Sequence, residues 1–155
     1  MGQKGLVMAG KIIKNKKKKG GVGKTTSTAN LGICLAMLGY QVACIDADIG
    51  LRNLDVMMGL ENRIVYDLIN YIEGRCRLKQ ALVRDKRFPD LFLMPAAQTR
   101  DKNAISVEDM TRVAKETAEL VDFVLIDSPA GIEHGFRYAV NPADLVLIVT
   151  NPEVT

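Results

Sequence analysis

Short apolar runs recur along this chain of 155 residues, separated by longer segments of mixed polarity. The clearest runs are residues 41–45, 91–94, 123–126 and 145–149. A short run that is apolar throughout is typical of a strand buried on both faces of a parallel sheet. Residues 11–15 are expected to form a further strand, although only Ile12 and Ile13 are apolar there. The pattern therefore predicts several buried strands.

Two segments have the apolar spacing of an α-helix. Residues 25–38 carry an apolar stripe and stop at Gly39, which is a C-terminal helix signal. The stripe consists of Ala29, Ile33, Ala36 and Met37. Ser106 and Asp109 match a capping box, and a second stripe follows them. That stripe consists of Val107, Met110, Val113, Ala114, Thr117 and Val121.

Residues 49–90 fit no single period. Residues 56–60 and 64–72 have helical spacing, and residues 52–55 are typical of a polar turn, so we expect a long insertion between core strands. Around the first helix, by contrast, strand, helix and strand follow one another. Strands joined in this way are parallel, and ligands bind beyond their carboxyl ends. The expected fold class is α/β with a mainly parallel sheet.

A glycine-rich segment precedes the first helix and reads Lys19-Gly20-Gly21-Val22-Gly23-Lys24-Thr25-Thr26. Its glycines allow the backbone to curl with N–H groups pointing inward, at the point where a helix begins, so the segment predicts a phosphate cradle. The common P-loop pattern has one more glycine, where this chain has Lys18. A Rossmann dinucleotide site fits less well, because Thr26 stands where that pattern needs its third glycine.

Three side chains complete a triphosphate site in this interpretation. Lys24 supplies an ammonium group for the terminal phosphates, and Thr25 supplies a hydroxyl group for Mg²⁺. Asp127 follows an apolar run directly and is the acid expected to hold the metal through its water shell. By itself Asp127 could equally be a turn residue.

Asp46 and Asp48 follow the strand expected at residues 41–45. Either could be a turn residue or a helix cap. We favour Asp46 as the group that orients the attacking water, because in-line hydrolysis needs a placed acceptor beside the phosphates.

Composition narrows the class of protein. With 48% hydrophobic residues the chain can bury one core, so one domain is expected. No apolar run approaches the roughly 18 residues of a membrane span, and the start lacks the apolar core of a secretory signal, so a cytosolic location is expected.

Cys34, Cys44 and Cys76 form no paired motif and are expected to be buried free thiols. His134 is the only histidine and is expected to have a surface or structural role.

The net charge of +3 is concentrated near the N-terminus. Residues 1–20 contain seven lysines and no acid, whereas the rest of the chain has a small acidic excess. A nucleic-acid-binding fold would spread its basic residues over one face, so we expect a solvated arm instead. Residues 1–10 are expected to be an N-terminal extension, and residues 11–155 a partial ATPase domain.

The glycine segment resembles the deviant Walker A loop of the MinD/ParA family of ATPases, in which the early lysine is characteristic. Further segments resemble the septum-determining, MinD-type branch of that family. They are residues 45–55, 59–67, 80–87, 95–102, 126–133 and 151–154, and the resemblance covers most of residues 8–155. It implies a P-loop NTPase fold with three α/β/α layers, whose C-terminal part is missing from this chain.

For the site, the resemblance implies an ATPase with ATP and Mg²⁺ as cofactors. Lys19 would reach the nucleotide of a partner subunit, Lys24 the phosphates of its own subunit, and Asp46 the attacking water. Thr25 and Asp127 would form the Mg²⁺ site. The remaining nucleotide-binding positions would be Gly20, Gly21, Val22, Gly23, Thr26 and Asp48.

For the cell, the resemblance implies an ATP-dependent homodimer that helps to position the division septum. Such a protein recruits the division inhibitor MinC and is discharged by MinE-type regulators. The intact parent would lie on the inner face of the cell membrane through a C-terminal amphipathic helix that this chain lacks, or in the stroma if encoded in a plastid. No specific nucleic acid is expected as a partner.

The stretch before the glycines departs from the family pattern of apolar residues followed by Thr-Ser-Gly-Lys. Of residues 14–19, only Lys19 agrees, and Lys18 occupies a glycine position. A lysine there has less backbone freedom than glycine, which could strain the loop, whereas its added positive charge attracts triphosphate. The two effects oppose each other. Two alternatives stay open: an inactive interaction fragment whose lysine arm binds acidic lipid or nucleic acid, and a ParA-type DNA-partitioning ATPase.

Overall fold

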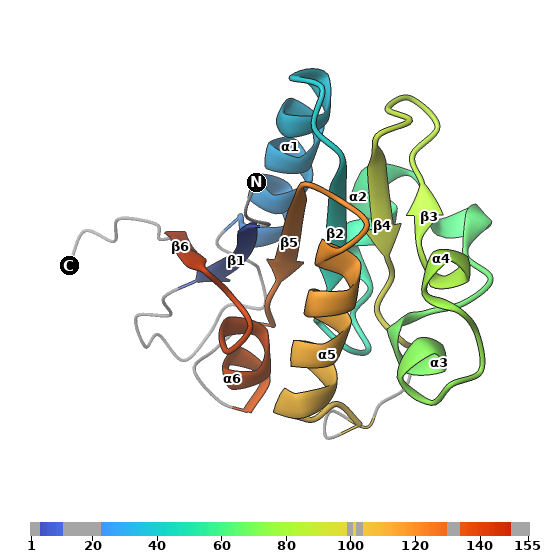
Figure 1. The fold of residues 1–155 in the computed structure, drawn as a ribbon, viewed down its shortest axis with the longest axis vertical. Helices are drawn as coiled ribbons and strands as arrows, with labels where there is room; N and C mark the ends of the chain where they lie inside the picture. Colours follow the sequence, from blue (N-terminus) through green and yellow to red (C-terminus); the bar gives the residue numbers. More distant parts are fainter. Residues whose placement is uncertain (1–3, 11–22, 99–100, 102–103, 130–133, 150–155) are drawn as a thin grey trace.

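The computed structural model describes residues 4–10, 23–98, 101, 104–129 and 134–149. Its described strands form one sheet in the order β3-β4-β2-β5-β1-β6 (Figure 1). They run Lys4–Gly10 (β1), Val42–Asp46 (β2), Val83–Arg84 (β3), Leu91–Met94 (β4), Phe123–Asp127 (β5) and Leu145–Val149 (β6). Neighbouring strands are parallel except for β3, which pairs antiparallel with β4. The predicted α/β fold with a mainly parallel sheet is confirmed.

Helices cover both faces of this sheet, giving three layers (Figure 1). They run Lys24–Met37 (α1), Asn53–Met58 (α2), Leu68–Ile72 (α3), Leu78–Ala81 (α4), Val107–Ala118 (α5) and His134–Val140 (α6), with a 3-10 turn at Glu61–Arg63. The alternation of side chains along β2 separates the two cores. Val42 and Cys44 pack in the cluster that contains residues of α1 and α2, whereas Ala43 and Ile45 pack in the cluster under α5.

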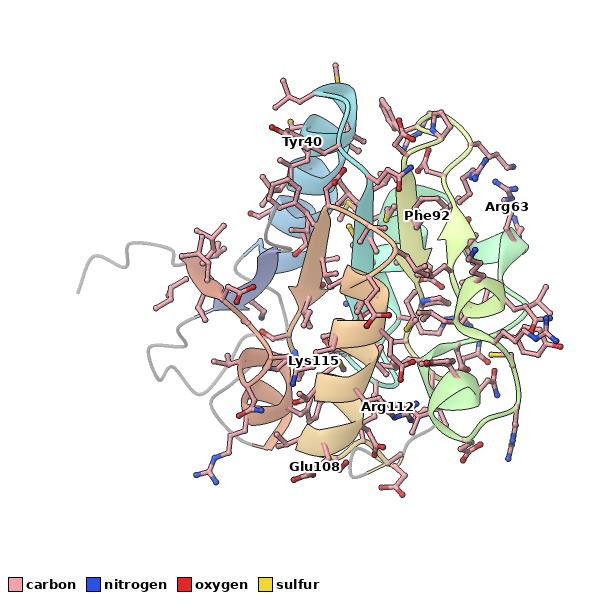
Figure 2. All side chains as sticks on the ribbon, viewed as in Figure 1. Tyr40, Arg63, Phe92, Glu108, Arg112 and Lys115 are labelled. Carbon is pink, nitrogen blue, oxygen red and sulfur yellow. The ribbon has the colours of Figure 1, made fainter. Side chains whose placement is uncertain are left out.

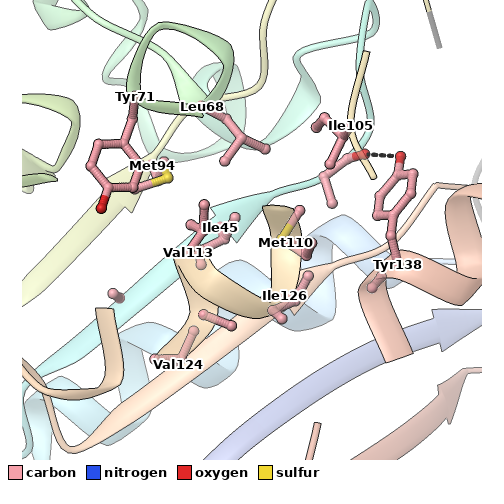
Figure 3. Packing of buried hydrophobic residues seen from close by; sticks show 14 of the residues in the cluster. Ile45, Leu68, Tyr71, Met94, Ile105, Met110, Val113, Val124, Ile126 and Tyr138 are labelled. Atoms are coloured by element: carbon pink, nitrogen blue, oxygen red, sulfur yellow. Dashed lines mark hydrogen bonds between the residues drawn. The ribbon is translucent and has the colours of Figure 1, made fainter. Parts of the chain in front are cut away.

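Helix α5 has the N-terminal cap and the buried apolar face that its sequence predicts. The Ser106 hydroxyl accepts a hydrogen bond from the Asp109 N–H at 3.0 Å, and the Ser106 N–H donates to the Asp109 carboxylate at 3.2 Å, so the predicted capping box is present. The inward residues Met110, Val113, Ala114 and Thr117 are buried, and Figure 3 shows part of this core. Glu108, Arg112 and Lys115 lie on the exposed side of the helix (Figure 2). This amphipathic division holds α5 against the sheet.

The strand next to the glycine segment differs from the prediction. Residues 11–15, where that strand was expected, lie outside the described residues. The structure instead places β1 at residues 4–10, between β5 and β6, with Lys4 opposite Phe123 and Gly10 opposite Val149. Seven residues of the expected extension therefore belong to the sheet, and the remaining domain boundaries stay a prediction.

The segment between β2 and β4 is an insertion of short elements. Helix α3 falls within the stretch of helical spacing at residues 64–72. Helix α2 overlaps the stretch at residues 56–60 only over residues 56–58, because it begins at Asn53, in the segment expected to be a polar turn. Helix α4 and the two-residue strand β3 were not predicted. Among the thiols, Cys44 is buried, Cys76 is half-buried and Cys34 is exposed, so the prediction of three buried thiols is confirmed for Cys44 alone. Burial raises the pKa of the Cys44 thiol to about 12.

Within the described ranges no helix combines the length and apolarity that crossing a membrane requires.

Helix α1 approaches the sheet closely at Gly32. A Cβ atom at this position would lie 2.9 Å from Cys44 Sγ and 3.2 Å from a methyl carbon of Leu91. Gly32→Val is therefore expected to lower the free energy of unfolding by about 1–3 kcal/mol, because the core has no room for the added atoms. Urea denaturation followed by circular dichroism measures this. Asn30→Val, at an exposed position of α1, is the control and should change stability by about 0.5 kcal/mol or less.

Candidate active site

Two carboxylates meet at the carboxyl end of the sheet. Asp46 is the last residue of β2 and Asp127 the last residue of β5, and the two are partners in the parallel register of these strands. Both residues are nearly inaccessible to solvent, with exposures of 1% and 2%. The sequence prediction that these acids lie at one edge of the sheet, beside the start of α1, is therefore matched by the described geometry.

The end of the glycine segment is described from Gly23 onward. Gly23 has φ +92° and ψ 15°, a left-handed conformation that glycine adopts without strain. A Cβ atom there would meet no atom of the described residues within 4 Å, so these residues leave the space beside Gly23 open. The Gly23 carbonyl accepts the Ser27 N–H at 2.9 Å, which starts α1. Lys19, Gly20, Gly21 and Val22 lie outside the described residues, so their predicted contacts with phosphate stay predictions.

The first turn of α1 brings a cation and a hydroxyl group to Asp127. The Thr25 hydroxyl donates to Asp127 Oδ2 at 2.7 Å. Lys24 is buried, with 6% of its surface exposed. Burial raises the pKa of Asp127 to about 6, and the Thr25 hydrogen bond and the Lys24 charge oppose that rise. Thr26, the other threonine of the motif, is exposed.

Asp46 is turned toward the backbone of the segment that follows it. Its two carboxylate oxygens accept the N–H of Asp48 at 3.0 Å and the N–H of Leu54 at 3.3 Å. Burial raises the pKa of Asp46 to about 8; the two N–H donors oppose the rise, while the nearby charges of Asp127 and Asp48 add to it. Asp48 itself is only half-buried. Through these two hydrogen bonds Asp46 therefore holds the backbone of the segment that follows β2.

Two residues at the site were not predicted. Thr28 Oγ1 lies 2.9 Å from the Lys24 carbonyl oxygen and 3.4 Å from Asp127 Oδ1, so it supports the same carboxylate one turn further along α1. The spacing of four residues from Lys24 was a usable signal for Thr28. The Tyr138 hydroxyl donates to the Ala47 carbonyl at 2.9 Å, shown as a dashed line in Figure 3. No local pattern indicated Tyr138, because it comes from α6, 91 residues away.

The described residues fit a magnesium nucleotide. Carboxylate and hydroxyl oxygens, which Asp127 and Thr25 provide, are the ligands that Mg²⁺ prefers. Lys24 supplies a positive charge at the same place, and the space that the described residues leave open at Gly23 lies where the loop joins the helix. In a P-loop site such a lysine contacts phosphate and such a threonine contacts the metal.

Comparison with known proteins gives the same picture. Residues 10–155 match a family model described as an AAA domain. The septum site-determining protein MinD of Bacillus subtilis (strain 168) is 59% identical over 138 residues, which are 88% of this chain and 52% of that protein. MinD of a Synechocystis species is 56% identical over 137 residues. The chain spans about half the length of the curated relatives that it matches.

Solved structures agree in fold. MinD in a MinC:MinD cell division complex from Aquifex aeolicus superposes with a TM-score of 0.81 at 49% identity, covering 97% of this chain and 57% of that one. MinD from Pyrococcus horikoshii, complexed with Mg-ADP, gives a TM-score of 0.82 at 28% identity, covering 97% of this chain and 59% of that one. The predicted P-loop fold of three α/β/α layers is confirmed. The chain belongs to the AAA domain family, and its relatives within that family are MinD-type P-loop ATPases.

Proposed function

We propose that this chain is the nucleotide-binding part of a Min-system ATPase, which binds ATP with Mg²⁺ and hydrolyses it to regulate the position of the division septum. One observation carries the proposal: at the sheet edge where α1 begins, the Thr25 hydroxyl donates a hydrogen bond to Asp127, and the charge of the buried Lys24 acts on the same carboxylate. The Mg-ADP complex of the Pyrococcus horikoshii relative supports the same choice of cofactors.

The proposal assigns a separate role in nucleotide binding or hydrolysis to each site residue. Lys24 binds the phosphates of its own nucleotide, and Lys19 reaches the nucleotide of a partner subunit. Thr25 and Asp127 hold the Mg²⁺ site, where bound metal neutralises charge that develops on the phosphates. Gly20, Gly21, Val22, Gly23 and Thr26 surround the phosphates with backbone and hydroxyl groups. Asp46 orients the attacking water, and Asp48, the more exposed acid of the same segment, binds at the nucleotide.

The proposed partners follow from the relatives. The solved complex of MinC with MinD from Aquifex aeolicus supports a MinC-type partner. We add an ATP-dependent homodimer, discharge by a MinE-type regulator, and a peripheral position on the inner face of the membrane for the intact parent. All four concern the whole protein, of which this chain spans about half.

Isothermal titration calorimetry with Mg-ATP tests the binding step. We expect one saturable site whose affinity depends on Mg²⁺, and a loss of about tenfold or more in Thr25→Val, which lacks the hydroxyl group on Asp127. Thr111→Val, on α5 and away from the sheet edge, should bind like the unaltered chain.

Two results would count against the proposal. The site assignment is wrong if neither this chain nor a variant with residues 14–18 restored to the family pattern binds Mg-ATP. Binding to acidic vesicles or nucleic acid that weakens steeply with salt and ignores ATP would instead indicate the interaction fragment.

A further inference from the structure

Arg52 has an unusual backbone conformation. Its φ of 48° and ψ of 55° place it in the left-handed region, and it is the one non-glycine residue with positive φ in the part of the chain that the structure describes. L-residues other than asparagine and aspartate rarely adopt this conformation, because the Cβ atom crowds the following carbonyl. Something must therefore hold Arg52 there.

The Arg52 side chain is held by a buried acid. Its Nε and Nη2 atoms both donate to Asp55 Oδ2, at 2.9 and 2.7 Å. The Asp55 side chain is 2% exposed and the Arg52 side chain 18% exposed, so this is not a solvent-screened surface pair. Removing either charge would leave the other one buried without its partner, which is costly. The pair therefore holds residues 52–55 in one arrangement.

This arrangement fixes the start of α2 against Asp46. Arg52 is the N-cap of α2 but provides no side-chain cap. The N–H of Leu54, in the first turn, is satisfied by the Asp46 carboxylate at 3.3 Å. Leu54 is also completely buried in the core next to α1. A change in the backbone at residue 52 would turn the Leu54 N–H away from Asp46.

We propose that Arg52 is a positioning residue. Its ion pair with Asp55 holds residue 52 in the left-handed conformation. This conformation directs the Leu54 N–H onto Asp46 and so fixes the position of the segment that carries Asp46 and Asp48. Backbone strain of this kind concentrates at functional sites, where surrounding contacts maintain it. The inference about hydrolysis rests on the proposed function. The inference about Leu54 rests only on the described contacts.

A pair of double variants isolates the backbone effect. Arg52→Ala with Asp55→Asn and Arg52→Gly with Asp55→Asn both lack the ion pair, and both avoid an unpaired buried charge. They differ only in the cost of the left-handed conformation, which glycine adopts freely and alanine does not. Arg75→Ala, which removes an exposed arginine that pairs with Glu73, is the matched control.

The first readout needs no nucleotide. We expect amide hydrogen exchange at Leu54, measured by NMR on the full chain, to be about tenfold faster in the alanine variant than in the unaltered chain, and close to the unaltered rate in the glycine variant. Equal exchange in the two double variants would overturn the positioning role. This result stands even if the chain fails to bind ATP, so the failure of one proposal can be told from the failure of the other.

The second readout is steady-state ATP hydrolysis. In the alanine variant kcat is expected to fall by about ten- to a hundredfold, while the dissociation constant of a fluorescent ADP analogue changes by less than about threefold. The glycine variant should recover most of kcat, and Arg75→Ala should match the unaltered chain. Equal loss of kcat in both double variants, or a loss of ADP affinity equal to that of kcat, contradicts the proposal.

Discussion

Lys24→Met is expected to remove most of the nucleotide affinity of this chain, with a dissociation constant for Mg-ATP at least about a hundredfold higher. The ammonium group is buried at the start of α1 beside Asp127, where the dielectric constant is lower than in water and a charge on phosphate is felt more strongly. Methionine preserves the length and much of the volume of the side chain, so the change isolates the charge. Fluorescence titration with an ATP analogue measures it.

Lys79→Met is the control for this experiment, because Lys79 lies exposed on α4, in the insertion. It should bind the analogue like the unaltered chain. A thermal melt of each protein shows whether lost binding reflects lost folding. An affinity of Lys24→Met within about threefold of the unaltered chain would mean that Lys24 is a core residue rather than a phosphate ligand.

Raising the pH from 5 to 8 is expected to destabilise the ligand-free chain by about 5 kcal/mol, measured by urea denaturation with EDTA present. The pKa of Asp46 is raised to about 8 and that of Asp127 to about 6, against an ordinary value of 3.8. Between the ordinary and the raised pKa the folded state keeps a proton that the unfolded chain has released. The folded state therefore binds more protons there, and the free energy of unfolding falls as the pH rises.

The two acids act in different parts of this range. Asp127 contributes up to about pH 6, and Asp46 continues to about pH 8. In Asp46→Asn the difference in stability between pH 5 and pH 8 should shrink by about half or more, since the group with the wider window is gone. Equal stability of the unaltered chain at the two pH values, or greater stability at pH 8, would contradict the cause assigned to these shifts.

Where local pattern and tertiary packing agree, the sequence predicts the structure well. The runs at 91–94 and 145–149 are strands with those bounds, and the runs at 41–45 and 123–126 end one residue later, on Asp46 and Asp127. An acid directly after a buried run is an informative signal when the sequence also contains a phosphate-binding loop, because ligands of a parallel sheet bind beyond the carboxyl ends of its strands. That signal was enough to expect both acids at one edge of the sheet.

Elsewhere the controlling contacts are distant in sequence. Residues 4–10 have no polar side chain after Lys4 and no alternating pattern, and what makes them a strand is pairing with β5 and β6, more than a hundred residues away. Strand β3 has two residues, which is too short for any periodicity. Tyr138 reaches Ala47 from α6. The left-handed conformation of Arg52 depends on an ion pair three residues further on, which the interpretation of residues 52–55 as a polar turn did not include.

The pairing of Asp46 with Asp127 also bears on how β2 and β5 find one another during folding. Each acid follows a run of buried apolar residues, and the two acids are level in the sheet. If one strand slid by a residue, its side chains would exchange faces and the carboxylate of one strand would come level with an apolar residue of the other. The two acids that we propose for nucleotide chemistry thus also penalise misaligned pairing, and on that proposal selection for activity and selection for correct folding act on the same two positions.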